Sequence, residues 1–120
     1  MMNTKRAIPA LAALAQETRL AIFRLLVQRG PEGLAAGDIA ERLSLPASSL
    51  SFHLAQLSHA GMIAQRRQSR SLIYSVDFAA MNDLMGFLTE NCCGGNADLC
   101  APVCKPGASP KQTAKSRRVA

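Results

Sequence analysis

The chain has no cysteine in its first 91 residues, no tryptophan, and only 4% aromatic residues. Since 120 residues can bury a core of their own, disulfide bonds are not needed to hold the fold together. No stretch approaches the length of roughly 18 uncharged apolar residues that a transmembrane helix requires, which excludes such a helix. Alanine and leucine, by contrast, are abundant and favour helices. We therefore expect one mainly helical domain in the cytoplasm, where thiols stay reduced.

The sequence also lacks the patterns of catalysis: it has no Ser/His/Asp arrangement, no glycine-rich phosphate loop and no paired carboxylates. We therefore expect neither an enzyme nor a small-molecule substrate. Acidic residues are few, with 8 Asp and Glu against 14 Lys and Arg, so the formal net charge is +6. A basic balance favours polyanions, either nucleic acid or an anionic membrane surface, and charge alone does not choose between them.

Two helices are predicted near the N-terminus. The first spans Ile8 to Ala15, with Pro9 tolerated in its first turn. Basic residues before a short apolar run are typical of a signal peptide, but polar residues interrupt the run, so an amphipathic helix is the better interpretation. The second helix spans Thr18 to Gln28, where apolar residues recur every three or four positions, and the segment RGPEG ends it.

A helix-turn-helix pattern follows. Asp38 to Leu43 predicts a short helix, and Ser44 to Pro46 predicts a tight turn. Pro46 is well placed to open a second helix, which stops at Gly61. This second helix is apolar on one side, at Leu50, Leu54 and Leu57. Two short helices joined by a tight turn form the helix-turn-helix motif.

The next stretch predicts a hairpin and a last helix. Met62 to Val76 has the composition of two strands, with Ser69 and Arg70 at the turn between them. A basic hairpin after a helix-turn-helix is a wing. Phe78 to Leu88 returns to helical spacing. The predicted fold is mainly α (α+β): a winged helix-turn-helix of about five helices plus a two-stranded β-hairpin wing.

The second helix of the motif has a polar side that suits DNA. If its leucines face the core, steps of about 100° per residue put the opposite side at Ser48, Ser51, Phe52 and Ala55, with Ser49 and Gln56 at its edge. Small hydroxyls let a helix sit deep in the major groove, glutamine can pair with adenine, and an aromatic ring can touch a thymine methyl group. His53 is kept in the predicted DNA-binding set, although its position near the core side favours a packed histidine.

Three arginines of the hairpin, Arg66, Arg67 and Arg70, are predicted to meet backbone phosphates or the minor groove. A solvated helix and a charged hairpin would explain the serines and the arginines separately. The ordered combination of helix, turn, helix, basic hairpin and positive net charge favours DNA binding. We therefore predict double-stranded operator DNA as a partner, no membrane, and no cofactor requirement for DNA binding.

These motifs together resemble a known family. LAALAQETRLAIFRLLV, GDIAERLSLPASSLSFHLAQLSHAGMI and QRRQSRSLIYSV are similar to the ArsR/SmtB family of metal-sensing bacterial transcriptional repressors, over about Ile8 to Asn91. The most specific parts are ETRLAIFRLL and SFHLAQLSHAGMI. The resemblance implies a winged helix-turn-helix homodimer, built by the first and last helices, that leaves its operator when an inducer binds.

The chain departs from the family pattern at the metal sites. Founding arsenic repressors carry a Cys-Val-Cys motif before the turn, where this chain has Ala35, Ala36 and Gly37. The His and Asp ligands of the zinc-sensing branch have no match around Asn82 to Glu90. Four cysteines follow the last helix instead, which resembles family members that sense trivalent arsenic through an adjacent Cys-Cys pair and a downstream cysteine.

The ligand set of these cysteines has several interpretations. Soft thiolates select soft ions. Trivalent arsenic or antimony takes three thiolates on one side, which favours Cys92, Cys93 and Cys100, with Cys104 as a substitute third ligand or a spare. Zinc, cadmium or lead is the alternative, although an adjacent pair suits tetrahedral zinc poorly. Thiol oxidation is another, since Cys92 or Cys93 could pair with Cys100 or Cys104, and the thiols could also be incidental.

Three regions are predicted along the chain. Residues 1–91 form the winged helix-turn-helix DNA-binding and dimerisation domain, and residues 92–104 form a cysteine-rich inducer-binding segment. Residues 105–120 are rich in Pro, Ser and Lys without apolar periodicity, which predicts a disordered basic tail.

Overall fold

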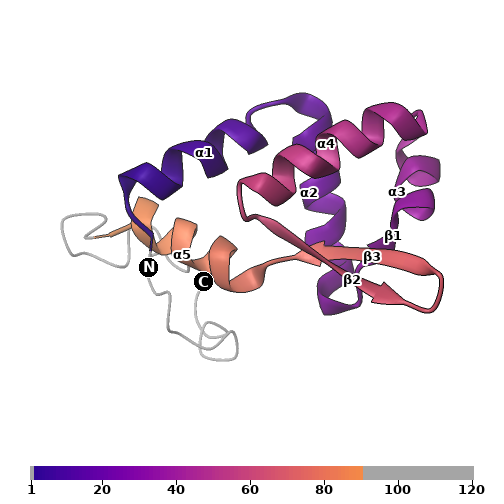
Figure 1. The fold of residues 1–120 in the computed structure, drawn as a ribbon. Helices are drawn as coiled ribbons and strands as arrows, with labels where there is room; N and C mark the ends of the chain where they lie inside the picture. Colours follow the sequence, from indigo (N-terminus) through magenta and orange to yellow (C-terminus); the bar gives the residue numbers. More distant parts are fainter. Residues whose placement is uncertain (1, 91–120) are drawn as a thin grey trace, which may run out of the picture.

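A computed structural model describes residues 2–90 of the chain (Figure 1). These residues form five α-helices, a short 3-10 helix and a three-stranded antiparallel sheet, which confirms the predicted mainly α winged helix-turn-helix class. In chain order the elements are α1 (Thr4–Leu14), α2 (Glu17–Arg29), η1 (Gly30–Glu32), β1 (Leu34–Ala35), α3 (Ala36–Leu43), α4 (Ala47–His59), β2 (Ile63–Gln68), β3 (Ser71–Val76) and α5 (Phe78–Leu88).

Helix α1 begins four residues before its predicted start. Asn3 caps it, because its side-chain oxygen accepts a hydrogen bond from the backbone N–H of Arg6 at 3.0 Å. The prediction that Pro9 lies in the first turn is therefore wrong: Pro9 is inside the helix, on its exposed side. The buried side of α1 carries only alanines, at Ala7, Ala10 and Ala13, whose small size lets the helix pack closely on α2, α4 and α5.

The helix-turn-helix consists of α3, the turn around Ser44, and α4. Ser44 adopts the left-handed conformation (φ 54°), and the N–H of Leu45 donates to the Ala40 carbonyl at 2.9 Å, closing a Schellman turn. Pro46 is the N-cap of α4. The helix ends at His59, and the positive φ of Gly61 (79°) turns the chain into β2.

The wing is the β2–β3 hairpin, which runs in register from Ile63↔Val76 to Gln68↔Ser71 around a left-handed Ser69. A third strand, β1, pairs with the other edge of β3, so the sheet has the order β1-β3-β2. The prediction of a two-stranded sheet missed β1, because a strand of two residues is too short to show an alternating pattern.

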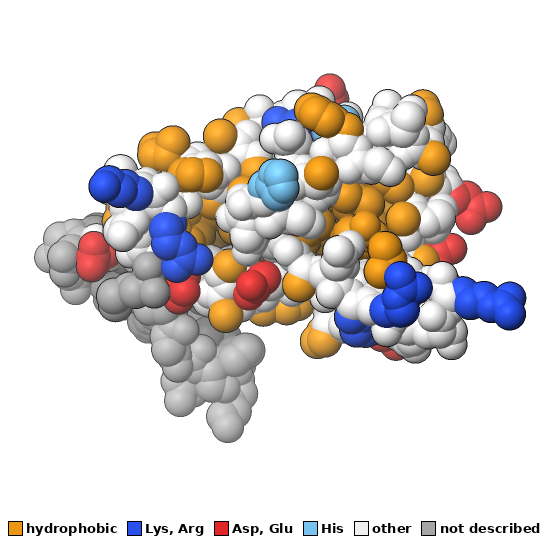
Figure 2. Space-filling view, viewed as in Figure 1, with side chains coloured by type: hydrophobic (Ala, Val, Ile, Leu, Met, Phe, Trp, Pro, Cys, Tyr) orange, Lys and Arg blue, Asp and Glu red, His pale blue; other side chains and the backbone are white. Residues whose placement is uncertain are grey.

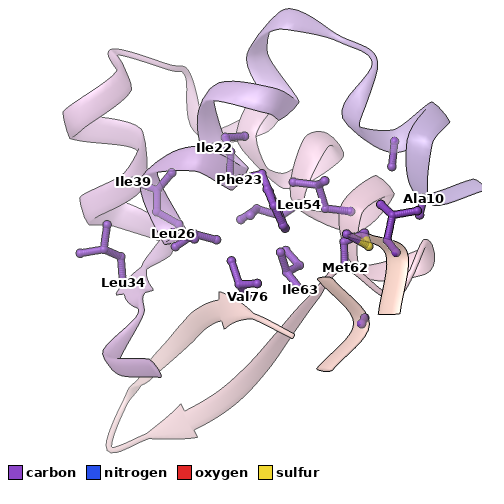
Figure 3. Packing of buried hydrophobic residues seen from close by; sticks show 14 of the residues in the cluster. Ala10, Ile22, Phe23, Leu26, Leu34, Ile39, Leu54, Met62, Ile63 and Val76 are labelled. Carbon is purple, nitrogen blue, oxygen red and sulfur yellow. The ribbon is translucent and has the colours of Figure 1, made fainter. Parts of the chain in front are cut away.

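One hydrophobic core joins the helices to the sheet. Ile22 and Leu26 of α2, Ile39 of α3 and Leu54 of α4 meet Ile63 and Val76 of the hairpin base (Figure 3). Helix α5 packs beside α1 at the end of the molecule away from the hairpin (Figure 1). Among residues 2–90, no helix is both long enough and apolar enough to cross a membrane.

Candidate nucleic-acid interface

Helix α4 presents the two faces that the sequence predicts. Leu50, Leu54 and Leu57 are all buried against the core. The face turned to solvent carries small and polar side chains together with one aromatic ring. Its exposed members are Ser48, Ser51, Phe52, Ala55 and Gln56, and Ser49 lies half-buried at its edge. The face could therefore enter a groove of DNA without rearrangement of the helix.

Phe52 is the most conspicuous side chain of this face. It is 58% exposed, far more than a phenylalanine that serves the core, such as Phe23 at 7%. Its only ring contact in the described chain is with His53, edge to face at 5.6 Å between centroids. An exposed aromatic ring beside serine hydroxyls could contact a thymine methyl group.

His53 lies apart from this face, half-buried between helices. Its Nδ1 is 3.5 Å from a guanidinium nitrogen of Arg19 on α2. Arg19 also donates from Nε to the carbonyl of Ala13 at 2.7 Å, and its backbone N–H is capped by the Gln16 side chain. The structure thus places His53 in the packed position that its spacing favoured. The sequence analysis missed Arg19, because the partners of its side chain lie on other helices.

The wing arginines differ from one another. Arg66 donates to the backbone carbonyls of Pro31 and Glu32 at 3.2 and 2.9 Å, and to the side chain of Gln68 at 3.4 Å. Arg67 and Arg70 are exposed, and their side chains make no hydrogen bond or ion pair with another residue of the described range. Figure 2 shows Lys and Arg side chains gathered at the hairpin end of the molecule.

The four cysteines assigned to an inducer site, Cys92, Cys93, Cys100 and Cys104, lie outside the described residues. Within residues 2–90, no group of three or more His, Cys, Asp or Glu side chains is arranged to hold a metal ion.

A helix-turn-helix followed by a basic hairpin defines a winged helix-turn-helix DNA-binding protein. Comparison with known proteins agrees: the family model described as "Helix-turn-helix domain" matches residues 14–66. The transcriptional activator HlyU of Vibrio cholerae is 30% identical over 94 residues, which cover 78% of this chain and 84% of HlyU. The HTH-type transcriptional regulator YgaV of Escherichia coli is 30% identical over 91 residues, which cover 76% of this chain and 90% of YgaV.

Solved structures give the same result. An ArsR-like transcriptional regulator from Rhodococcus sp. RHA1 superposes with a TM-score of 0.65 at 25% identity, over 79% of this chain and 85% of that one. The chain therefore belongs to the ArsR/SmtB-like family of winged helix-turn-helix transcriptional regulators. Because these relatives are transcriptional regulators, the expectation that the protein is not an enzyme is confirmed.

Proposed function

We propose that this protein is a repressor that binds operator DNA as a homodimer and releases it when trivalent arsenic or antimony binds its C-terminal cysteines. The proposal is supported mainly by the position of the cysteines directly after the last helix. A cluster of four thiols, the only ones in the chain, begins four residues after the end of α5. Helix α5 packs against α1, which also contacts α4. Ligand binding at the C-terminal end of α5 can therefore affect the position of α4.

DNA binding in this proposal uses α4 and the wing. The exposed face of α4 enters the major groove, where Ser48, Ser51 and Gln56 contact base edges or phosphates. The wing supplies positive charge to the backbone, chiefly through Arg67 and Arg70, whose guanidinium groups have no partner in the described chain. No cofactor is needed for this interaction.

The homodimer is proposed to form through α1 and α5. Both helices expose apolar side chains although they pack on each other: Ile8 is 59% exposed and Leu88 53%, and Leu11 and Met85 are also exposed. Apolar side chains on two neighbouring helices are typical of a surface that another protein covers. A winged helix-turn-helix domain of Mycobacterium bovis described as homodimeric has the same fold, with a TM-score of 0.58 at 24% identity.

The inducer is proposed to gather Cys92, Cys93 and Cys100, with Cys104 as a substitute for the third ligand. Three soft thiolates suit a trivalent ion with a lone pair. Ligation shifts the end of α5 and hence the spacing of the two α4 helices, which must match successive major grooves. A coupling free energy of about 1–3 kcal/mol would weaken DNA binding about 5- to 150-fold.

The test is a titration of the protein into a duplex selected by the inducer-free protein from a random pool, with and without arsenite. We expect arsenite to weaken binding, and the double variant Cys92→Ser/Cys93→Ser to bind DNA normally but to ignore arsenite. Cys104→Ser is the matched control and is expected to keep the response, if Cys100 is the third ligand. Normal release of the double variant by arsenite would show that the site is assigned wrongly.

A second candidate is a repressor that responds to thiol oxidation, or to zinc, cadmium or lead, through the same cysteines. One similar solved structure is described as "Reduced HlyU from Vibrio cholerae N16961", so a redox state is distinguished in that relative (32% identity, TM-score 0.57). Release of DNA by peroxide in metal-free buffer, absent in the cysteine variants, would favour oxidation. Release by zinc, cadmium or lead but not by arsenite would favour another soft metal.

A further inference from the structure

Arg66 makes contacts unlike those of the other wing arginines. Its guanidinium reaches from β2 to the carbonyl oxygens of Pro31 and Glu32, which lie 35 and 34 residues earlier in the chain. These two acceptors belong to η1, the turn that leads into β1 on the opposite edge of the sheet. The side chain therefore crosses β3 and joins both edges of the sheet near the middle of the hairpin.

The turn that receives Arg66 is held from its other side as well. Arg29, at the end of α2, contacts the Glu32 carboxylate at 3.0 Å and the Gly33 carbonyl at 3.4 Å. Gly33 lies so close to β3 that a Cβ atom on it would meet the carbonyl oxygen of Tyr74. Because η1 contacts both α2 and β3, its carbonyls lie at a defined place to which the hairpin can be attached.

Arg66 and Arg67 lie on opposite faces of the hairpin, because successive side chains of a strand alternate. Arg67 is opposite Leu72 and shares its face with Ile63 and Val76, whose side chains point toward the helices (Figure 3). This is the face on which α4 lies. Arg66 is opposite Ile73, on the other face.

We infer that Arg66 does not bind phosphate but is a positioning residue, which attaches the hairpin to η1 and so fixes where Arg67 meets the DNA backbone. The inference rests on the proposed DNA binding. Both terminal guanidinium nitrogens, the pair that a bidentate contact with phosphate would use, already donate to two carbonyls and to the Gln68 side chain. A lysine at this position would keep the charge but would offer one nitrogen in place of the two that reach the separate carbonyls, without the fixed geometry of a planar fork.

The experiment measures binding of the full chain to duplex DNA of mixed sequence over a range of salt concentrations. The variants are Arg66→Ala, Arg66→Lys, Arg67→Ala and the double variant Arg66→Ala/Arg67→Ala. Removing one phosphate-binding side chain lowers the slope of log K against log salt by about 0.9. If Arg66 acts through Arg67, the double variant shows about the same slope as Arg67→Ala alone, and Arg66→Lys behaves like Arg66→Ala. Reductions of slope that add in the double variant, or full rescue by lysine, would overturn the inference.

A second measurement on DNA-free protein separates this inference from the proposed function. Hydrogen exchange of the β2–β3 amides is expected to rise several-fold in Arg66→Ala and to stay unchanged in Arg67→Ala, because the Arg67 side chain has no partner in the described chain. Equal exchange rates in the two variants would contradict the attachment of the hairpin to η1 through Arg66. If exchange behaves as expected but the wild-type protein does not bind duplex DNA, the proposed DNA binding fails and the positioning role for Arg67 fails with it.

Discussion

The guanidinium of Arg19 on α2 lies 3.5 Å from Nδ1 of His53 on α4 and donates at 2.7 Å to the Ala13 carbonyl at the end of α1. One side chain of α2 therefore contacts two other helices. Helix α1 belongs to the proposed dimer surface and α4 to the proposed DNA surface, so Arg19 links the two.

Replacing Arg19 with alanine is expected to destabilise the protein by about 1–3 kcal/mol, because the variant cannot make the charge-assisted hydrogen bond to a helix-end carbonyl. The midpoint of urea unfolding should fall without a change of slope. Arg24→Ala is the matched control, since Arg24 is on the same helix, is exposed and has no partner in the described chain. Equal stability of the two variants would contradict a role for Arg19 in joining the helices.

Replacing Phe52 with alanine is expected to leave stability nearly unchanged but to weaken DNA binding, because the ring is 58% exposed. Phe23→Ala is the contrasting variant: that ring is buried, and its removal should cost about 3–5 kcal/mol. Thermal unfolding and DNA titration on both variants check the prediction. A stability loss in Phe52→Ala close to that of Phe23→Ala would place Phe52 in the core instead.

Gln56→Ala is expected to reduce discrimination between a selected operator and a duplex changed at one base pair, by about 1–3 kcal/mol if the amide pairs with a base. Its control is Gln28→Ala, an exposed glutamine on α2. The measurement is competition binding with single-base-pair variants of the operator. Uniform weakening on every duplex would mean that Gln56 contacts phosphate and carries no sequence information.

Leu11→Glu and Leu88→Glu are expected to shift the protein from dimer to monomer, because each puts a charge into the proposed α1–α5 interface. Sedimentation velocity measures the change. Leu72→Glu is the control, since Leu72 is an exposed leucine of the wing. A dimer that survives both helix variants and dissociates with the wing variant would place the interface elsewhere.

Gly33→Ala is expected to destabilise the protein more than a typical surface substitution. Gly33 has φ 69°, and an added Cβ would lie against the Tyr74 carbonyl and 3.0 Å from Cγ2 of Ile73. Gly37→Ala is the control, because Gly37 is in α3 with open space where a Cβ would be added, and alanine favours helix there by up to about 1 kcal/mol. Opposite shifts in melting temperature are expected, and a tolerated Gly33→Ala would contradict the packing of η1 on β3.

The faces of α4 and the hairpin were predictable because local patterns encode them. Leucines at three- and four-residue steps determine which side of α4 is buried, and alternation determines the hairpin. The start of α1 depends on a single cap at Asn3, which a search for apolar periodicity overlooks.

The partners of Arg66 and Arg19 could not be predicted in the same way. Arg66 bonds to carbonyls 34 and 35 residues away, and Arg19 contacts a histidine 34 residues away. Every residue has a carbonyl, so no side-chain pattern distinguishes the acceptors. The sequence analysis therefore grouped Arg66 with Arg67 and Arg70, whereas in the structure its contacts differ from theirs.

The packing of α1 on α5, far from the hairpin, has a mechanical consequence (Figure 1). If two copies join at these helices, each protomer is held at its α1–α5 end and contacts DNA near its opposite end. A small rotation of one protomer at the α1–α5 interface then displaces its hairpin by a larger distance, because the hairpin is far from the axis of rotation. An effector acting at this interface would then need only a slight angular change. The spacing of the two DNA-contacting surfaces would no longer match successive turns of a duplex.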